Sequence, residues 1–76
     1  MNISHITTQT SRFNGAEIVP AFRDMVKTKQ PFTVWIEYVN NCVPIPFING
    51  QCQSRIVEES AKALLSKVLG DVEYAY

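Results

Sequence analysis

The fold of this chain is decided by one stretch of its sequence, FTVWIEYVNNCVPIPFI, which runs from Phe32 to Ile48. β-branched and aromatic side chains fill residues 32–39, a composition typical of a strand. Asn40 and Asn41 tolerate positive φ and predict a turn, after which residues 42–48 return as a second strand. We therefore predict a β-hairpin as the centre of the fold.

Two prolines, Pro44 and Pro46, restrict how the strands of this hairpin can pair, because proline has no N–H to donate into a ladder. A two-residue turn at the asparagines would place both prolines at hydrogen-bonded sites. A four-residue loop from Val39 to Cys42 avoids this. We prefer the register that this loop gives, in which the facing pairs are Tyr38 with Val43, Ile36 with Ile45, and Val34 with Phe47. Both prolines then point outward, and the second strand is an edge of the sheet.

The remainder of the chain predicts two helices and further strands. Apolar residues recur at helical spacing over Ala16–Lys29, although Pro20, which is tolerated only in a first turn, could delay the helix to about Val19. A second helix is predicted over Ser54–Leu69, with an apolar stripe of Val57, Ala61, Leu64, Leu65 and Val68. Strands are predicted at residues 2–9, for about two residues from Gln51, and at residues 72–76, with a loop over Ser11–Gly15.

These elements follow one another in the order β-α-β-β-α-β within a single domain, residues 1–76. We therefore expect an α+β fold, a two-layer sandwich in which two helices cover one face of a small, mostly antiparallel sheet. The ferredoxin-like plait has the same order of elements. It places its third strand in the centre of the sheet, however, where Pro44 and Pro46 would be poorly tolerated. We therefore favour a related or irregular topology.

Composition and charge narrow the function classes. Hydrophobic residues make up 46% of the 76 residues and charged residues 18%, as in an ordinary globular domain. Seven basic residues balance seven acidic ones, so no net charge attracts the chain to nucleic acid or anionic lipid. The sequence has no signal-peptide pattern and no apolar run long enough for a membrane helix, so we expect a cytoplasmic protein without membrane contact. Cys42 and Cys52 are then expected to be free thiols.

No pattern in the sequence indicates catalysis, a metal ion or a cofactor. His5 is the only histidine, and no serine or cysteine lies in a nucleophile motif, so we assign no catalytic residue. Cys42 and Cys52 lack the close cysteine or histidine pairing of zinc sites. In the preferred register they fall on opposite faces, and we interpret them as small buried residues. The glycines stand singly at turns, so no phosphate-binding loop is predicted.

The strand pattern also predicts a second apolar face. Two helices can cover one side of the sheet, which leaves little chain to cover the other. The apolar residues that point to this other side are Trp35, Val39, Pro44, Pro46 and Ile48. Exposed apolar surface centred on a tryptophan is typical of a protein-binding site. The alternative is that the N-terminal segment or a helix folds over this face, in which case Trp35 belongs to the core.

Three function classes stay open. The first is a non-enzymatic protein-binding module, a small regulator or inhibitor of a larger enzyme or complex such as phages and mobile elements encode. Its partner is another protein or a second copy of the chain, which would make a homodimer. The second is a small nucleic-acid-binding domain that uses the basic residues around the first helix, Arg12, Arg23, Lys27 and Lys29. The third is a small enzyme that works only as an oligomer, with His5 or a cysteine recruited across an interface. We favour the first.

Overall fold

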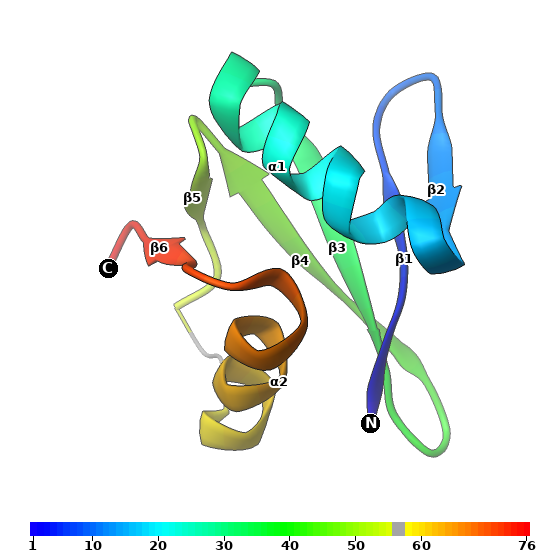
Figure 1. The fold of residues 1–76 in the computed structure, drawn as a ribbon. Helices are drawn as coiled ribbons and strands as arrows, with labels where there is room; N and C mark the ends of the chain where they lie inside the picture. Colours follow the sequence, from blue (N-terminus) through cyan, green and yellow to red (C-terminus); the bar gives the residue numbers. More distant parts are fainter. Residues whose placement is uncertain (56–57) are drawn as a thin grey trace.

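A single β-sheet organises the molecule (Figure 1). The computed structural model describes residues 1–55 and 58–76, and within them six strands lie across the sheet in the order β2-β1-β3-β4-β5-β6. Neighbouring strands are antiparallel except β5 and β6, which are parallel. The elements are β1 (Asn2–Thr7), β2 (Arg12–Asn14), η1 (Gly15–Glu17, a 3-10 turn), α1 (Ile18–Thr28), β3 (Phe32–Glu37), β4 (Cys42–Ile48), β5 (Gln51–Cys52), α2 (Glu59–Leu69) and β6 (Glu73–Tyr74). The predicted α+β class with a mostly antiparallel sheet is confirmed.

The segment between β1 and α1 differs from its prediction. The sequence predicts a loop over Ser11–Gly15, but Arg12–Asn14 form the strand β2, which folds back along β1. The turn between them is tight because the Thr8 hydroxyl accepts a hydrogen bond from the Ser11 amide at 3.0 Å, while the Thr8 amide donates to the Ser11 carbonyl at 2.9 Å. Phe13 of β2 then packs against the core, and this apolar contact stabilises β2.

Apart from β2, which lies outside β1 at the edge, the strands lie side by side in the order in which they occur along the chain: β1, β3, β4, β5 and β6. The ferredoxin-like plait would insert β4 between β1 and β3. Instead β1 and β3 pair directly, from Asn2–Glu37 at one end to Thr7–Thr33 at the other, with a bulge between Ile3 and His5. The plait is therefore not formed.

The hairpin of β3 and β4 forms as predicted, but the preferred register is wrong by two residues. Val34 faces Ile45 rather than Phe47. The loop has four residues, as predicted, but it runs from Tyr38 to Asn41 rather than from Val39 to Cys42. The Tyr38 amide donates a hydrogen bond to the Asn41 carbonyl at 2.7 Å, which closes the loop. A shift of two residues keeps every side chain on its predicted face, since side chains alternate with a period of two.

The two prolines fit this register because of where their ring nitrogens point. Hydrogen-bonded and non-hydrogen-bonded pairs alternate along an antiparallel ladder. Tyr38 and Asn41, whose hydrogen bond closes the loop, form the first hydrogen-bonded pair. Pro44 and Pro46, which face Trp35 and Thr33, therefore occupy non-hydrogen-bonded sites, with their nitrogens directed away from β3. The predicted edge position of this strand holds only in part, since within the described residues β5 pairs with the last two residues of β4 and not with the residues before them.

The start of α1 agrees to within one residue with the later of the two predicted starts, about Val19. Residues 15–17 form the 3-10 turn η1, and α1 begins at Ile18. Pro20 therefore lies in the first turn, where no N–H is needed. The helix ends at Thr28, after which Lys29 adopts a left-handed conformation with φ of 63°.

The second helix is shorter than predicted. It begins at Glu59 rather than Ser54, and the predicted stripe residue Val57 lies outside the described residues. Its buried residues are Ala61, Leu65 and Leu69. Leu64 is only partly buried and Val68 is 37% exposed, so the stripe is rotated from its predicted position.

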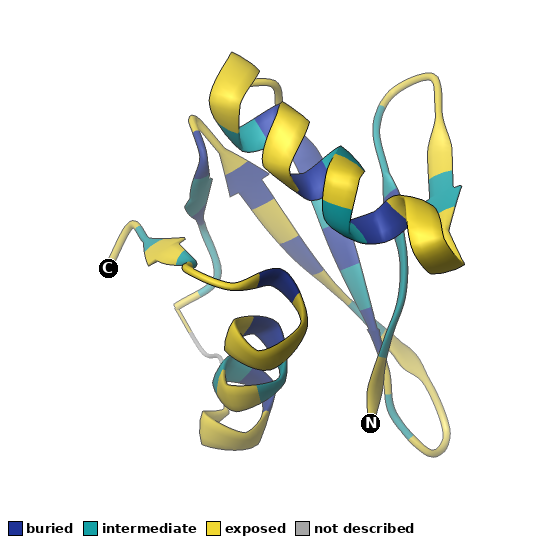
Figure 2. Ribbon diagram, in the orientation of Figure 1, coloured by how far each residue is buried: buried dark blue, intermediate teal, exposed yellow. Residues whose placement is uncertain are grey.

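One hydrophobic core lies between the sheet and the two helices (Figures 1 and 2). Buried residues of both helices belong to the same cluster as Val34 and Ile36 of β3, which are 0% exposed. Phe22, Phe32 and Phe47 pack together within it, with ring centroids 4.8 to 5.6 Å apart. Both helices thus lie on one face of the sheet, and no helix of the described residues lies on the other.

Candidate binding face

Alternation along the strands gives the sheet two different faces. On β4, Ile45 and Phe47 are buried, whereas Pro44, Pro46 and Ile48 are exposed. Figure 2 shows this alternation along the strand. We call the side under the helices the covered face. The opposite side, formed by the outward-pointing residues of the six strands, is the open face.

The centre of the open face is apolar and nearly free of charge. Strand pairing places Trp35 beside Pro44, and Thr33 beside Pro46, with Ile48 at the end of the same strip. Ile48 is 50% exposed, although it is a large hydrophobic residue. Among the strand residues on this face, only three are charged: Arg12 on β2, Glu37 on β3 and Glu73 on β6. Two of them, Arg12 and Glu73, thus lie at the two outer edges of the sheet.

Trp35 is held rigidly in this face. Its indole Nε1 donates a hydrogen bond to the Thr7 hydroxyl at 2.9 Å. The ring stacks against the imidazole of His5, with centroids 5.6 Å apart and an interplanar angle of 13°. Trp35 is half-buried and lies outside the core cluster. Because β1 lies alongside it rather than over it, Trp35 presents a fixed aromatic surface to solvent.

His5 supports Trp35 and has no catalytic partners. Its Nδ1 lies 2.8 Å from the Ser4 hydroxyl. The pKa of His5 is lowered because partial burial, and secondarily the positive charge of Arg12, disfavour the imidazolium ion. Among the described residues, no carboxylate is hydrogen-bonded to the ring, so the arrangement lacks the orienting acid of a Ser-His-Asp triad.

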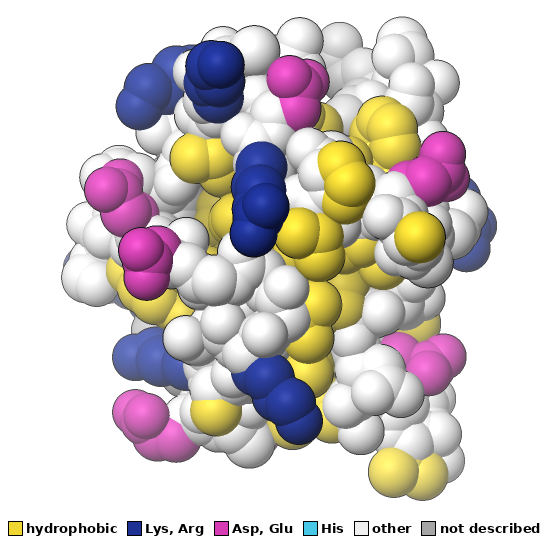
Figure 3. All heavy atoms as spheres, in the orientation of Figure 1, with side chains coloured by type: hydrophobic (Ala, Val, Ile, Leu, Met, Phe, Trp, Pro, Cys, Tyr) yellow, Lys and Arg dark blue, Asp and Glu magenta, His cyan; other side chains and the backbone are white. Residues whose placement is uncertain are grey.

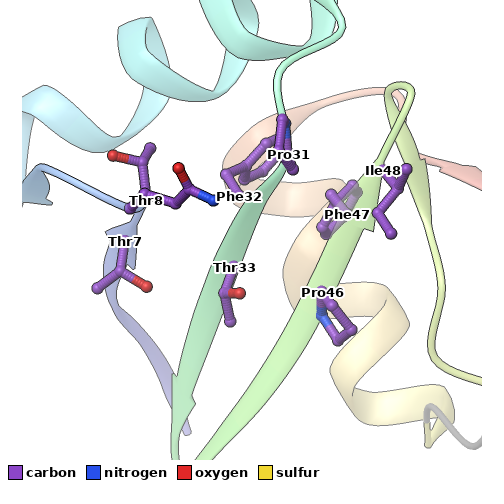
Figure 4. A pocket seen from close by; sticks show the side chains of 9 residues that line it. Thr7, Thr8, Pro31, Phe32, Thr33, Pro46, Phe47 and Ile48 are labelled. Carbon is purple, nitrogen blue, oxygen red and sulfur yellow. The ribbon is translucent and has the colours of Figure 1, made fainter.

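A hollow of about 340 Å³ lies at one end of the open face (Figure 4). It occurs where the loop before β3 meets the last residues of β4. Pro31, Pro46 and Ile48 give it apolar walls, and Thr7 and Thr33 give it hydroxyl groups. The hollow is large enough to admit an aliphatic side chain from another chain.

The helix side carries hollows of a different kind. Figure 3 shows hydrophobic side chains in the gap between α1 and α2. A hollow of about 490 Å³ there is lined by residues that include Phe22, Val26 and Leu69, and one of about 510 Å³ by residues that include Ile18, Leu64 and Val68. Several of these side chains belong to the core or pack against it. The helix-side hollows are therefore gaps above the core rather than a separate apolar surface.

The candidate residues named from the sequence are only partly brought together. Trp35, Pro44, Pro46 and Ile48 lie on the open face. Val39 does not extend that strip, because β3 ends at Glu37; it lies in the hairpin loop and is 96% exposed.

The four basic residues proposed for nucleic-acid binding are divided between the two sides of the sheet. Arg12 lies on the open face, where its Nε donates to the Asn14 side chain at 3.2 Å. Arg23 and Lys27 lie on α1, and Lys29 follows it, on the helix side. A single nucleic-acid strand could not contact all four at one surface.

The two cysteines lie on opposite faces, as predicted, and both are free thiols. Cys52 is buried in the core, and burial raises the pKa of its thiol. Cys42 is exposed on the open face, so its interpretation as a buried residue is wrong.

Sequence reasoning missed the contribution of β1 to this face. The partnership of His5 and Thr7 with Trp35 depends on β1 pairing with β3 and on the bulge between Ile3 and His5, which reverses the direction of the side chains that follow. The sequence around Ile6 carries no clear signal for it, because Ser4 and His5 before it and Thr7 and Thr8 after it are polar at consecutive positions.

Comparisons with known proteins provide no relative. No family model matches the chain, and no curated protein or solved structure is similar to it. Within the described residues, no helix has the length and apolar character needed to cross a membrane. Nor do these residues bring together three or more histidine, cysteine or acidic side chains able to hold a metal ion.

Proposed function

We propose that this chain is a non-enzymatic protein-binding module and that the open face is its contact surface. The observation that carries this proposal is a fixed aromatic residue, Trp35, in an apolar strip that no helix in residues 1–55 and 58–76 covers. A rigid tryptophan loses little conformational freedom on binding, which is why such residues often dominate the energy of protein interfaces. Exposed prolines beside it add apolar area at a similarly low entropic cost.

The geometry favours this class over the two alternatives. Nucleic-acid binding draws on a cluster of cations, and here Arg12 is separated from the cations of α1 by the sheet. Catalysis by His5 would need an acid to orient the imidazole, and among the described residues this ring contacts Trp35 and Ser4 but is hydrogen-bonded to no carboxylate. The open face is also sparsely charged, which suits a protein surface better than a phosphate backbone.

We further propose that binding regulates or inhibits the larger protein that is bound. A domain of 76 residues without a catalytic group acts by occupying a surface of its partner. Two free thiols, one of them exposed, fit a reducing compartment such as the cytoplasm.

The test is affinity capture from the native host with the wild-type chain, with Ile48→Asp on the open face, and with Val39→Asp as the matched control. Both changes place a carboxylate on an exposed apolar residue, but Val39 lies in the hairpin loop. We expect the wild type and Val39→Asp to retain one specific polypeptide, either another protein or a second copy of the chain. Ile48→Asp should not retain it.

Thermal unfolding of each variant verifies that the fold is intact. Trp35→Ala is a less selective probe, because the indole also holds Thr7 and His5 in place. Capture that is equal for all three chains, or no captured polypeptide at all, would refute the proposed function.

A further inference from the structure

The open face has three features that match one another across a twofold axis. Arg12 and Glu73 carry opposite charges at the two outer edges of the sheet, on β2 and β6. The centre of the face, where Trp35 lies beside Pro44 and Thr33 beside Pro46, carries no charge, and Glu37 lies at the end of β3 next to the hairpin loop. The chain as a whole has a net charge of zero, so two copies do not repel each other through a net field.

Building on the proposed function, we propose that the partner of the open face is a second copy of the chain. The two sheets pack face to face about a twofold axis that runs parallel to the strands, between β3 and β4. The result is a four-layer homodimer with the helices outside and the two open faces buried. Packed sheets with roughly aligned strands are a common arrangement, with the sheets about 10 Å apart.

This axis fixes which residues meet. It brings β3 of one copy over β4 of the other, so the ring of Trp35 lies on Pro44 of the second copy, and Thr33 lies on Pro46. It also brings β2 of one copy over β6 of the other, which sets Arg12 near Glu73 of the second copy. Symmetry makes each contact occur twice, so a face with one positive and one negative edge is complementary to itself.

The hollow at the end of the open face provides a second match. Ile48 lies on β4 and is 50% exposed, and it is level with Pro31 in the strand pairing. The same axis carries Ile48 of each copy onto the position of Pro31 in the other, which is a wall of the 340 Å³ hollow. Ile48 of one copy would thus pack against the apolar wall that Pro31 gives this hollow in the other copy.

The size of the face sets the expected strength of the dimer. Strands about 4.8 Å apart and about 3.3 Å of rise per residue give a flat area of at most roughly 500 Å². This is below the roughly 800 Å² per partner of a standard interface. We therefore expect a dimer that dissociates in the micromolar range, which a concentration series can resolve.

The experiment is sedimentation velocity over a range of concentrations, with Arg12→Glu, with Glu73→Arg and with an equimolar mixture of the two. Each single variant places like charges against each other at both edges and should weaken self-association about tenfold. In the mixture, every edge contact between the two different chains is again between opposite charges. The mixture should therefore form dimers with an affinity within about twofold of the wild type.

Recovery in the mixture also shows that both variants are folded. Ile48→Asp should abolish the dimer, and Val39→Asp should leave it unchanged. A wild-type chain that is monomeric at every concentration, a dimer insensitive to Ile48→Asp, or single variants that weaken without recovery on mixing would each overturn the proposal. If the chain does not associate with itself but the open face captures a different polypeptide, the homodimer is refuted and the proposed protein-binding function is retained.

Discussion

The covered face and the open face of the sheet are built from the same strands and differ in what lies over them. Along β3 and β4 every second residue enters the core, where Val34 and Ile36 are fully buried. The residues that alternate with these along the two strands, such as Trp35 and Pro44, lie outside the core cluster. The covered face accounts for the stability of the fold. The open face is apolar at its centre although no helix of the described residues covers it, and this is the reason for the proposal that it binds another chain.

Thiol accessibility should give the largest contrast between the two faces. Cys42 on the open face is exposed, whereas Cys52 on the covered face is fully buried with a raised thiol pKa. Cys52 should react only when the domain opens, which for a domain of ordinary stability slows the reaction on the order of a thousandfold or more. Titration with a thiol reagent should show one fast and one slow group. Cys42→Ser should remove the fast one, and two fast thiols would contradict the burial of Cys52.

Truncation on the covered face should be the next largest effect. Phe47 is 1% exposed and packs against Phe22 and Phe32. Phe47→Ala should lower the free energy of unfolding by about 3–5 kcal/mol, measured by chemical denaturation. The adjacent Ile48→Ala, on the open face, should change the stability of the monomer by less than about 1 kcal/mol. Similar losses for these two neighbours would remove the distinction between the faces.

Trp35 should fall between these limits, because it is fixed but only half-buried. Trp35→Ala removes the hydrogen bond to Thr7, worth about 1 kcal/mol, and the stack on His5, worth roughly another 1 kcal/mol. Trp35→Phe keeps an aromatic ring for the stack and should recover about half of the loss. If Trp35→Ala costs as much as Phe47→Ala, Trp35 belongs to the core after all.

The pH dependence of stability should show the smallest effect, through His5. Burial and Arg12 lower the pKa of His5 in the folded chain, so the unfolded chain binds the proton more strongly. The contribution of His5 should be constant above its unfolded pKa of about 6.5 and decrease as the pH falls from there through the folded pKa. Denaturation of the wild type and of His5→Gln at pH 7.5 and pH 5 should show a steeper loss for the wild type. Equal losses would contradict a lowered pKa.

The sequence is sufficient to predict the faces of the hairpin but not the way its strands pair. Alternation assigns each residue of β3 and β4 to a side, and that assignment survives a two-residue error in register because the period is two, whereas Val39 lies in the loop between them. The prolines exclude only those pairings in which their nitrogens would have to donate a hydrogen bond. The predicted and the observed register both place Pro44 and Pro46 at non-hydrogen-bonded sites, so the prolines could not distinguish between them. The hydrogen bond within the loop, from Tyr38 to Asn41, decided between them.

The candidate site was predictable only where it lies on the hairpin. Trp35, Pro44, Pro46 and Ile48 follow from local alternation. The edge residues Arg12 and Glu73 do not, because they belong to strands of two or three residues whose pairing depends on distant parts of the chain. Arg12 was grouped with the cations of the first helix by its position in the sequence, whereas the turn at Thr8 and the strand β2 direct it to the opposite side of the sheet.

The prolines of β4 also bear on how this chain avoids uncontrolled polymerisation. Within the described residues, β5 pairs only with the last two residues of β4, so the side of β4 that carries the proline nitrogens has no neighbouring strand along most of its length. A foreign strand approaching there would find no amide donor at Pro44 or Pro46, and the Pro46 carbonyl already accepts a hydrogen bond from the Gln53 amide at 2.8 Å. It could not continue the ladder, so the seeding of fibrils along this strand is blocked. In the proposed dimer, contact between copies depends instead on side chains of the open face, and a twofold contact joins two copies without extending into a polymer.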